Sequence, residues 1–243
     1  MRYAILSDIH SNLAAFRAVL ADMVGRRIDE VWCIGDTVGY GPYPNECLDL
    51  LKEQKHVCVA GNHDWGSAGL IDISAFHREA AFACQWTGTV LTAENMEYLK
   101  TLPETIERED FTFAHGSPRR PLYEYVLSAA AAKQNLEYFK TSFCLVGHSH
   151  YPSIYQHSIE AKSVFRHLEA GEEIMLDEGR YIINTGSVGQ PRDGDPRGSY
   201  AVFDSGARKI TLYRIPYDIA QTQQRMRSSG LPHYLAERLS LGQ

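Results

Sequence analysis

Paired cysteines, a long apolar run and an excess of positive charge are all missing from this sequence. Its five cysteines are scattered along 243 residues, with no Cys-x-x-Cys pair among them. Such a set argues against a disulfide framework, so we expect reduced cysteines and a cytoplasmic protein. No apolar stretch approaches the roughly 18 residues of a transmembrane helix, and the N-terminus has no apolar signal core. We therefore expect neither export nor a membrane partner.

The balance of charge also narrows the choice of partners. The chain has 24 Lys and Arg against 30 Asp and Glu, a formal net charge of −6. Proteins that hold nucleic acid through its phosphates are ordinarily basic, so we expect no stable nucleic-acid partner. A small anionic substrate stays open, because bound cations can reverse the sign of the local field. The sequence predicts no particular oligomeric state.

Short apolar runs alternate with helical patterns through the first 150 residues. Five runs predict buried strands, at 3–6, 31–34, 57–60, 111–114 and 143–146. After a predicted N-cap at Asn12, apolar residues recur at helical spacing, namely Leu13, Phe16, Leu20 and Val24. A further helix is predicted over 46–52. This rhythm predicts an α/β fold, a sheet with helices packed against it.

The rest of the chain follows other patterns. Residues 65–102 contain no strand-like run and predict two or three helices, which we interpret as a helical insertion. One more helix is predicted over 128–138, and the tail after Asp218 reads as helical with a break at Pro232. Antiparallel strands are predicted at 153–156, 163–167, 173–176, 181–184, 200–203 and 209–214. Without repeats or linkers, residues 1–243 are predicted to form one domain.

Five short polar motifs stand where predicted strands end. They are Asp8-x-His10, Gly35-Asp36, Gly61-Asn62-His63-Asp64, His115-Gly116 and Gly147-His148-Ser149-His150. The carboxyl ends of strands form the crevice in which α/β proteins bind ligands, so each motif would bring metal-binding side chains to a common edge. Singly, each motif is more often a turn, a helix cap or a buried histidine. Their joint occurrence in this order favours a shared site, and His148 and His150 would share one face of a regular strand.

The series DxH, GDxxGYG, GNHD, HG and GHSH resembles the calcineurin-like metallophosphoesterases over nearly the whole chain. The segment GSVGQPR at 186–192 resembles their small bacterial and archaeal phosphodiesterase/phosphatase branch. The resemblance implies an α/β (α+β) fold, a four-layer α/β/β/α sandwich with a dinuclear metal site at one edge.

Residue by residue, the resemblance also implies a set of metal ligands. It assigns Asp8, His10 and His150 to one divalent ion, and Asn62, His115 and His148 to a second, with Asp36 bridging both. These oxygen and nitrogen donors suit Mn²⁺, Fe, Zn²⁺ and Ni²⁺ alike. Among these ions we expect Mn²⁺. The expected reaction is hydrolysis of a phosphomonoester or phosphodiester by a hydroxide held between the two cations.

Other residues are candidates for handling the substrate. His63, beside Asn62, is expected to protonate the leaving oxygen or stabilise the phosphoryl group. Asp64 would either orient the imidazole of His63 or cap the following helix. Asn62 is expected to contact the substrate as well as a metal ion.

Three arginines and two tyrosines follow loops near the motifs. Arg119, Arg120 and Arg192 are candidates for phosphate recognition, since a guanidinium matches a phosphate bidentately, although isolated surface charges are the alternative. Tyr40 and Tyr43 would form a wall beside Asp36 or simply stiffen their turn.

Two other functions are compatible with the resemblance. One is a non-catalytic binding module, because the superfamily includes a retromer scaffold subunit that has lost productive chemistry. The complete ligand set and His63 argue against it here. The other is a DNA-repair nuclease, but those proteins are longer and more basic. The insertion at 65–102 is expected to roof the site and favour a small phosphoester substrate.

Overall fold

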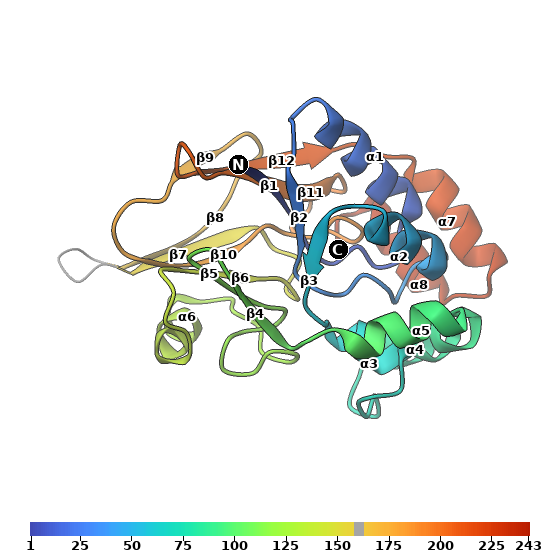
Figure 1. Ribbon diagram of the computed structural model, residues 1–243. Coiled ribbons are helices and arrows are strands. Elements are labelled where there is room, and N and C mark those ends of the chain that lie inside the picture. Colours follow the sequence, from blue (N-terminus) through green and yellow to red (C-terminus); the bar gives the residue numbers. More distant parts are fainter. Residues whose placement is uncertain (158–162) are drawn as a thin grey trace.

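The computed structural model describes residues 1–157 and 163–243, and its strands form two sheets (Figure 1). The first sheet contains, in spatial order, β3 (His56–Cys58), β2 (Glu30–Cys33), β1 (Arg2–Leu6), β11 (Gly198–Asp204), β12 (Lys209–Ile215) and β9 (Glu173–Met175). The second contains β4 (Thr105–Arg108), β5 (Phe111–Ala114), β6 (Phe143–Val146), β10 (Arg180–Asn184), β7 (Ser153–His157) and β8 (Val164–His167). Every predicted strand is present, and only the largely exposed β4, which has no apolar run, was not predicted.

Each of the two sheets contains one set of three parallel strands. β1, β2 and β3 run parallel to one another, and so do β5, β6 and β10. The other pairs are antiparallel. The predicted antiparallel pairing holds for one side of β10, which pairs with β7, but its other side pairs in parallel with β6. Its buried run of apolar residues is typical of such a central strand.

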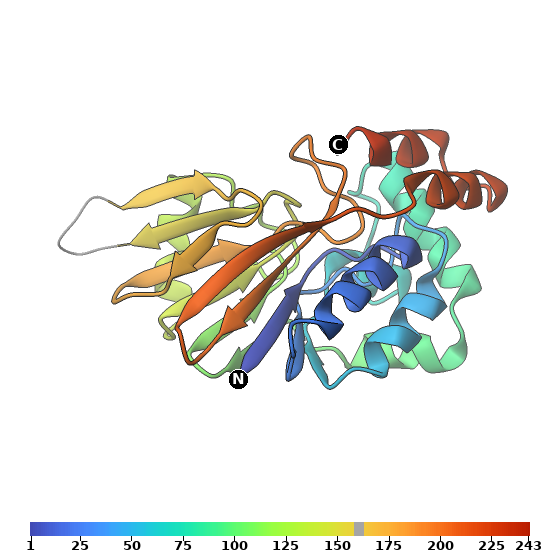
Figure 2. The same cartoon turned by 90° about the horizontal axis from the view of Figure 1, so that it is seen from above.

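Helices cover the outer face of each sheet. α1 (Leu13–Val24) and α2 (Pro44–Lys52) pack against the first sheet, as Figure 2 shows from above. α6 (Ala129–Asn135) and the short η1 (Leu136–Tyr138) cover the second. A third core, rich in aromatic residues such as Tyr3, Trp32 and Phe111, fills the space between the sheets. The predicted α/β/β/α sandwich is confirmed.

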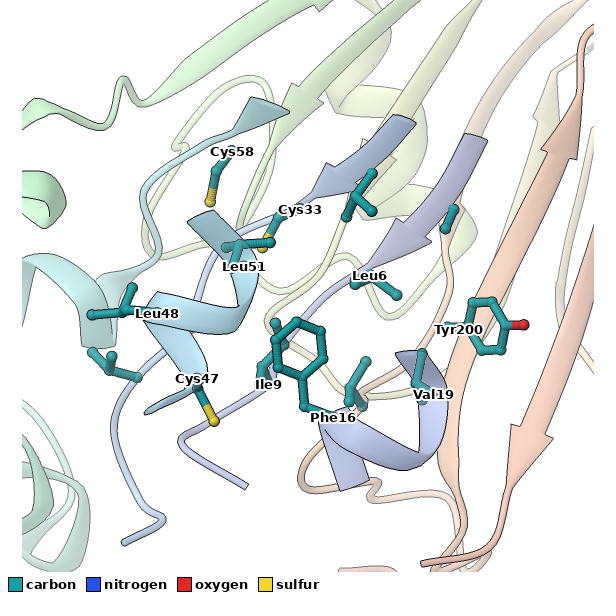
Figure 3. Close-up of a cluster of buried hydrophobic side chains, with 14 of the residues drawn as sticks. Leu6, Ile9, Phe16, Val19, Cys33, Cys47, Leu48, Leu51, Cys58 and Tyr200 are labelled. Carbon is teal, nitrogen blue, oxygen red and sulfur yellow. The ribbon is translucent and has the colours of Figure 1, made fainter. Parts of the chain in front are cut away.

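The core between α1, α2 and the first sheet shows how the sequence builds one layer (Figure 3). The N-cap at Asn12 is confirmed, since its side chain accepts a hydrogen bond from the Ala15 N–H. Phe16 and Val19 of α1 meet apolar side chains of α2 and of the strands. Val24, predicted on the buried stripe, is 82% exposed because the helix ends there, and Met23 is buried instead.

The remaining helices lie at one end of the sandwich. Between β3 and β4 are α3 (Asn62–Ser67), α4 (Arg78–Val90) and α5 (Ala93–Thr101), in the region predicted as a helical insertion. The chain ends in α7 (Ile219–Ser228), α8 (His233–Glu237) and η2 (Arg238–Ser240). Apolar side chains of α4, α7 and α8 form a fourth core with Tyr40. Among the described residues, no helix combines the length and the hydropathy needed to cross a membrane.

Candidate metal centre

The carboxyl ends of five parallel strands meet at one edge of the sandwich and bring the seven predicted ligands together. In the first sheet, β1 is followed by Asp8 and His10, β2 by Asp36 and β3 by Asn62. In the second, β5 is followed by His115, and β6 by His148 and His150. Each of these residues is at most 7% exposed.

Asp8, His10 and His150 form a first group, whose potential ligand atoms all lie within 4.8 Å of one another. The Nε2 atoms of the two histidines are 3.2 Å apart, and that of His150 is 3.2 Å from Oδ1 of Asp8. Ligand atoms about 2.1 Å from one ion lie roughly 3 Å apart, so this spacing suits a single cation.

Asp36, His115 and His148 form a second group at the same spacing. Nε2 of His115 is 3.2 Å from Oδ2 of Asp36, from Nδ1 of His148 and from Oδ1 of Asn62. The same Oδ2 of Asp36 is 3.6 Å from Nε2 of His10, in the first group. One carboxylate oxygen therefore faces both groups.

Backbone carbonyls fix the orientation of three of these imidazoles. Nδ1 of His10 lies 3.0 Å from the Val38 carbonyl, Nδ1 of His115 lies 2.8 Å from that of Ile34, and Nδ1 of His150 lies 2.6 Å from that of Gln190. A carbonyl only accepts, so each Nδ1 carries the proton and each Nε2 keeps its lone pair for a metal ion.

The carboxylates are oriented in the same way. Oδ2 of Asp8 accepts hydrogen bonds from the Ser7 hydroxyl and the His148 N–H, and Oδ1 of Asp36 accepts one from the His63 N–H. The other oxygen of each, Oδ1 of Asp8 and Oδ2 of Asp36, is buried without a hydrogen-bond partner among the described residues. Buried anionic oxygens are costly unless a cation compensates them, so the donors fit two divalent ions.

The protonation states of these buried side chains, considered without a bound metal ion, agree with this fit. Burial opposes the ionised form of Asp8, but His150, His115 and Ser7 together outweigh it and hold the pKa of the carboxyl below its usual range. Burial lowers the pKa of His148 to about 3, which leaves the neutral imidazole that binds metal ions. At His115 the attraction of Asp36 outweighs burial and raises the pKa, so a cation would take the place of that proton.

His148 and His150 follow β6, at the predicted strand end, but they lie in a turn and so do not share one face of a regular strand. Both have positive φ, +63° and +60°, because the chain turns sharply after β6. The turn separates their side chains, and each joins a different group. Gly147 allows it, since a Cβ there would collide with the Ser7 hydroxyl.

His63 lies beside the two groups, but Asp64 does not orient it. Both carboxylate oxygens of Asp64 accept backbone N–H groups, those of Val38 and Gly61, at 3.0 and 2.9 Å. The predicted alternative, a cap at the start of α3, is what these hydrogen bonds show. Nδ1 of His63 instead lies 3.2 Å from Sγ of Cys84 on α4.

A cavity of about 220 Å³ opens onto the site. Its walls are the loops that follow β2, β5, β6 and β10, the start of α3, and the start of α4 with the segment before it, with the residues Asp36, Tyr40, Asn62, His63, Ala75, Phe76, His77, Ala80, Tyr123, Tyr125, His148, His150 and Arg192. The ring of Tyr125 stacks on that of His148 with centroids 4.0 Å apart. A larger hollow of about 410 Å³ at the amino end of β2 contains none of the predicted site residues.

Of the three candidate arginines, one lines the cavity and two do not. Arg192 lines the cavity, and its Nε is buried without a hydrogen-bond partner among the described residues. Arg119 does not line it, because its guanidinium pairs with Glu124 and Gln134. Arg120 is exposed and also lies outside the cavity wall. Both were expected near the site only because they follow His115 in sequence.

The two tyrosines considered from the sequence lie in different places, because Tyr40 lines the cavity and Tyr43 packs beside α2.

Other residues at the site could not be predicted from any sequence motif. Tyr125 and Cys84 belong to no motif. The histidines are oriented by backbone carbonyls, which every residue has, so residue types could not predict these contacts. One of the carbonyls belongs to Gln190, which does lie in the GSVGQPR segment.

Comparisons with known proteins agree with this geometry. Residues 1–208 match the model of the calcineurin-like phosphoesterase superfamily domain. The chain is 39% identical over 244 residues to the uncharacterized protein MJ0912 of Methanocaldococcus jannaschii, across 98% of this chain and 97% of that one.

Solved structures give the same result. A metallophosphoesterase from Sphaerobacter thermophilus has 44% identity and a TM-score of 0.91, over 100% of this chain and 99% of that one. The hypothetical protein PH1004 from Pyrococcus horikoshii shares the fold, with a TM-score of 0.82 and 20% identity, over 100% and 98%. The predicted resemblance to small bacterial and archaeal metallophosphoesterases is confirmed. By its sequence, its fold and the two histidine–aspartate groups, this chain belongs to the calcineurin-like phosphoesterase superfamily.

Proposed function

We propose that this protein hydrolyses small phosphoesters at a site that holds two divalent cations. The observation that supports it most directly is the shared carboxylate, because Oδ2 of Asp36 faces His10 of one group and His115 of the other. Asp8, His10 and His150 would hold the first ion, and Asn62, His115 and His148 the second. When bound, two such cations supply Lewis-acid activation of the phosphoryl group and of a water molecule. Mn²⁺ is our first expectation, with Fe, Zn²⁺ or Ni²⁺ as alternatives.

Arg192 binds the phosphate in this proposal. Its guanidinium is held by Tyr40 and Gln190, at 3.4 and 3.1 Å, while its Nε lacks a partner in the described part of the chain. A charged donor without an acceptor at the wall of an anion-binding cavity gains a strong hydrogen bond when a phosphate enters.

His63 stabilises the leaving oxygen or the phosphoryl group in this proposal, through a hydrogen bond from its Nε2. It lines the cavity, and the contact with Cys84 is at its other nitrogen, Nδ1. Burial lowers the pKa of His63 to about 4, so the imidazole is a neutral donor at pH 7. A donor aimed at the charge that develops on a poor leaving group is worth about 10²–10³ in rate. The amide of Asn62 lines the cavity as well, which supports a contact with the substrate beside its role as a metal ligand.

The shape of the cavity favours a small substrate. Its volume of about 220 Å³ is below the usual range of sites for drug-sized ligands, roughly 300–1,000 Å³. Ala75, Phe76, His77 and Ala80, from the segment predicted as an insertion within a single domain, form one wall, which supports the proposed restriction of access. The five free, buried cysteines support a reducing, cytoplasmic location.

An activity screen tests the proposal. The protein, stripped with a chelator and reloaded with Mn²⁺, would be assayed on mono- and bis-aryl phosphates, cyclic nucleotides, dinucleoside tetraphosphates and a phosphopeptide. We expect metal-dependent hydrolysis of a small mono- or diester, and none by the stripped protein. Loss of all hydrolysis with both ions bound would contradict the proposal and favour a binding module.

A further inference from the structure

The imidazole of His63 has a single hydrogen-bond partner within the described ranges, the thiol of Cys84. Sγ lies 3.2 Å from Nδ1, and the cysteine is fully buried on α4. The two residues are 21 positions apart and belong to different helices, so the contact depends on the packing of α4 against α3. Burial outweighs the Ser67 hydroxyl, which also lies near this thiol and lowers its pKa.

Aromatic rings lie against other sides of the imidazole. Those of Tyr40, His10 and Phe76 have centroids 4.3, 4.9 and 5.5 Å away. Gly39, at φ +88°, approaches Nδ1 so closely that a Cβ would lie 2.6 Å from it, so no side chain can replace the glycine there. Asp64, the residue next to His63, holds backbone N–H groups instead.

The direction of the hydrogen bond follows from the chemistry of the thiol. Burial raises the pKa of the Cys84 thiol to about 12, so sulfur keeps its proton at neutral pH. A neutral thiol can donate S–H to Nδ1, and the imidazole then carries its own proton on Nε2. Nε2 is the nitrogen that remains for the cavity, and its N–H can donate a hydrogen bond to a leaving or phosphoryl oxygen while the proton stays on the neutral ring.

We propose that Cys84 is a positioning residue for His63, selecting the tautomer with the proton on Nε2 and aiming that N–H into the cavity. This inference rests on the proposed phosphoester hydrolysis. It gives α4 a role in the reaction beyond forming a wall, because the helix carries the group that orients this hydrogen-bond donor.

Three variants test the effect on turnover. Cys84→Ala removes the donor, Cys84→Ser keeps one, and Cys47→Ala removes an equally buried thiol on α2, away from the site. On an alkyl phosphoester, a poor leaving group, we expect Cys84→Ala to lower kcat about tenfold or more with KM and metal content unchanged. Cys84→Ser should stay within about threefold of the parent protein, and Cys47→Ala should match it. Equal losses in the alanine and serine variants of residue 84 would overturn the proposal.

A spectroscopic measurement separates this inference from the proposed function. Imidazole ¹⁵N NMR on the protein loaded with diamagnetic Zn²⁺ reports which nitrogen of His63 carries the proton, with His63→Asn used to assign the signals. We expect a protonated Nε2 and an unprotonated Nδ1 in the parent protein, and a change of that pattern in Cys84→Ala. A proton on Nδ1 in the parent would overturn the role of Cys84, whether or not any ester is hydrolysed.

Discussion

Five of the seven proposed ligands have backbones in the left-handed region, where side chains other than glycine are uncommon. Asp8, His10, Asp36, His148 and His150 have φ between +49° and +63°. Each such residue costs on the order of 1 kcal/mol, so the surrounding contacts must hold them. Backbone hydrogen bonds from Asp8 and His10 to the loop after β2 do so. Strain concentrated at one place is typical of a functional site.

His63→Asn tests the proposed hydrogen-bond donor. An asparagine is smaller than histidine but keeps the backbone N–H to Asp36, so both metal ions should stay bound. We expect kcat on an alkyl phosphoester to fall about 10²-fold, with a smaller loss on a p-nitrophenyl ester, whose leaving oxygen needs little stabilisation. Steady-state kinetics with both esters, together with metal analysis, would check it. Equal losses on the two esters would argue against a contact with the leaving oxygen.

Arg192→Ala tests phosphate recognition. Because Arg192 lines the cavity and its Nε lacks a hydrogen-bond partner among the described residues, its loss should raise KM about tenfold or more. Arg120→Ala is the matched control, an exposed arginine outside the cavity wall, and should leave KM unchanged. Comparable changes in both variants would show a general effect of charge.

Among the elements, the loop between β5 and α6 positions the aromatic wall of the cavity. It presents Tyr123 and Tyr125, and Glu124 between them ties the loop to α6 through Asn135. Burial opposes the ionisation of Glu124, but hydrogen bonds from Arg119, Ser117 and Asn135 outweigh it and lower the pKa to about 2.

This lowered pKa predicts how stability depends on pH. A depressed folded-state pKa stabilises the fold above the unfolded value, 4.5, and that contribution disappears as the pH falls from there towards 2. Glu124→Gln should therefore lower the free energy of unfolding by about 1–2 kcal/mol at pH 7. Urea unfolding at several pH values should show the two proteins converging at low pH. A difference that stays constant down to pH 3 would exclude the ionised pair as its source.

The sequence predicted the site residues whose positions follow from the strand directly before them. Ligands such as Asp36 and His115 directly follow apolar strands, so their position at the sheet edge could be predicted. The contact of Cys84 with His63 depends on how two helices pack, and no spacing in the sequence reports it. Arg119 was misplaced for a related reason, since proximity to His115 in sequence does not reveal its pairing with Glu124.

At the scale of the whole molecule, two sheets are needed to make one site. The first supplies Asp8, His10, Asp36 and Asn62, and the second supplies the other three histidines. The aromatic core between the sheets fixes their separation, and with it how closely ligands from the two sheets approach one another within each group. The α/β/β/α class followed from the family resemblance, but the parallel pairing of β10 with β6 did not, because pairing depends on distant partners.

The central claim is that Asp36 joins two cation sites, and anomalous X-ray diffraction from crystals soaked in Mn²⁺ tests it most directly. We predict two anomalous peaks, one among Asp8, His10 and His150 and one among Asn62, His115 and His148, with Asp36 within ligand distance of both. A single peak, or peaks away from these side chains, would contradict the account.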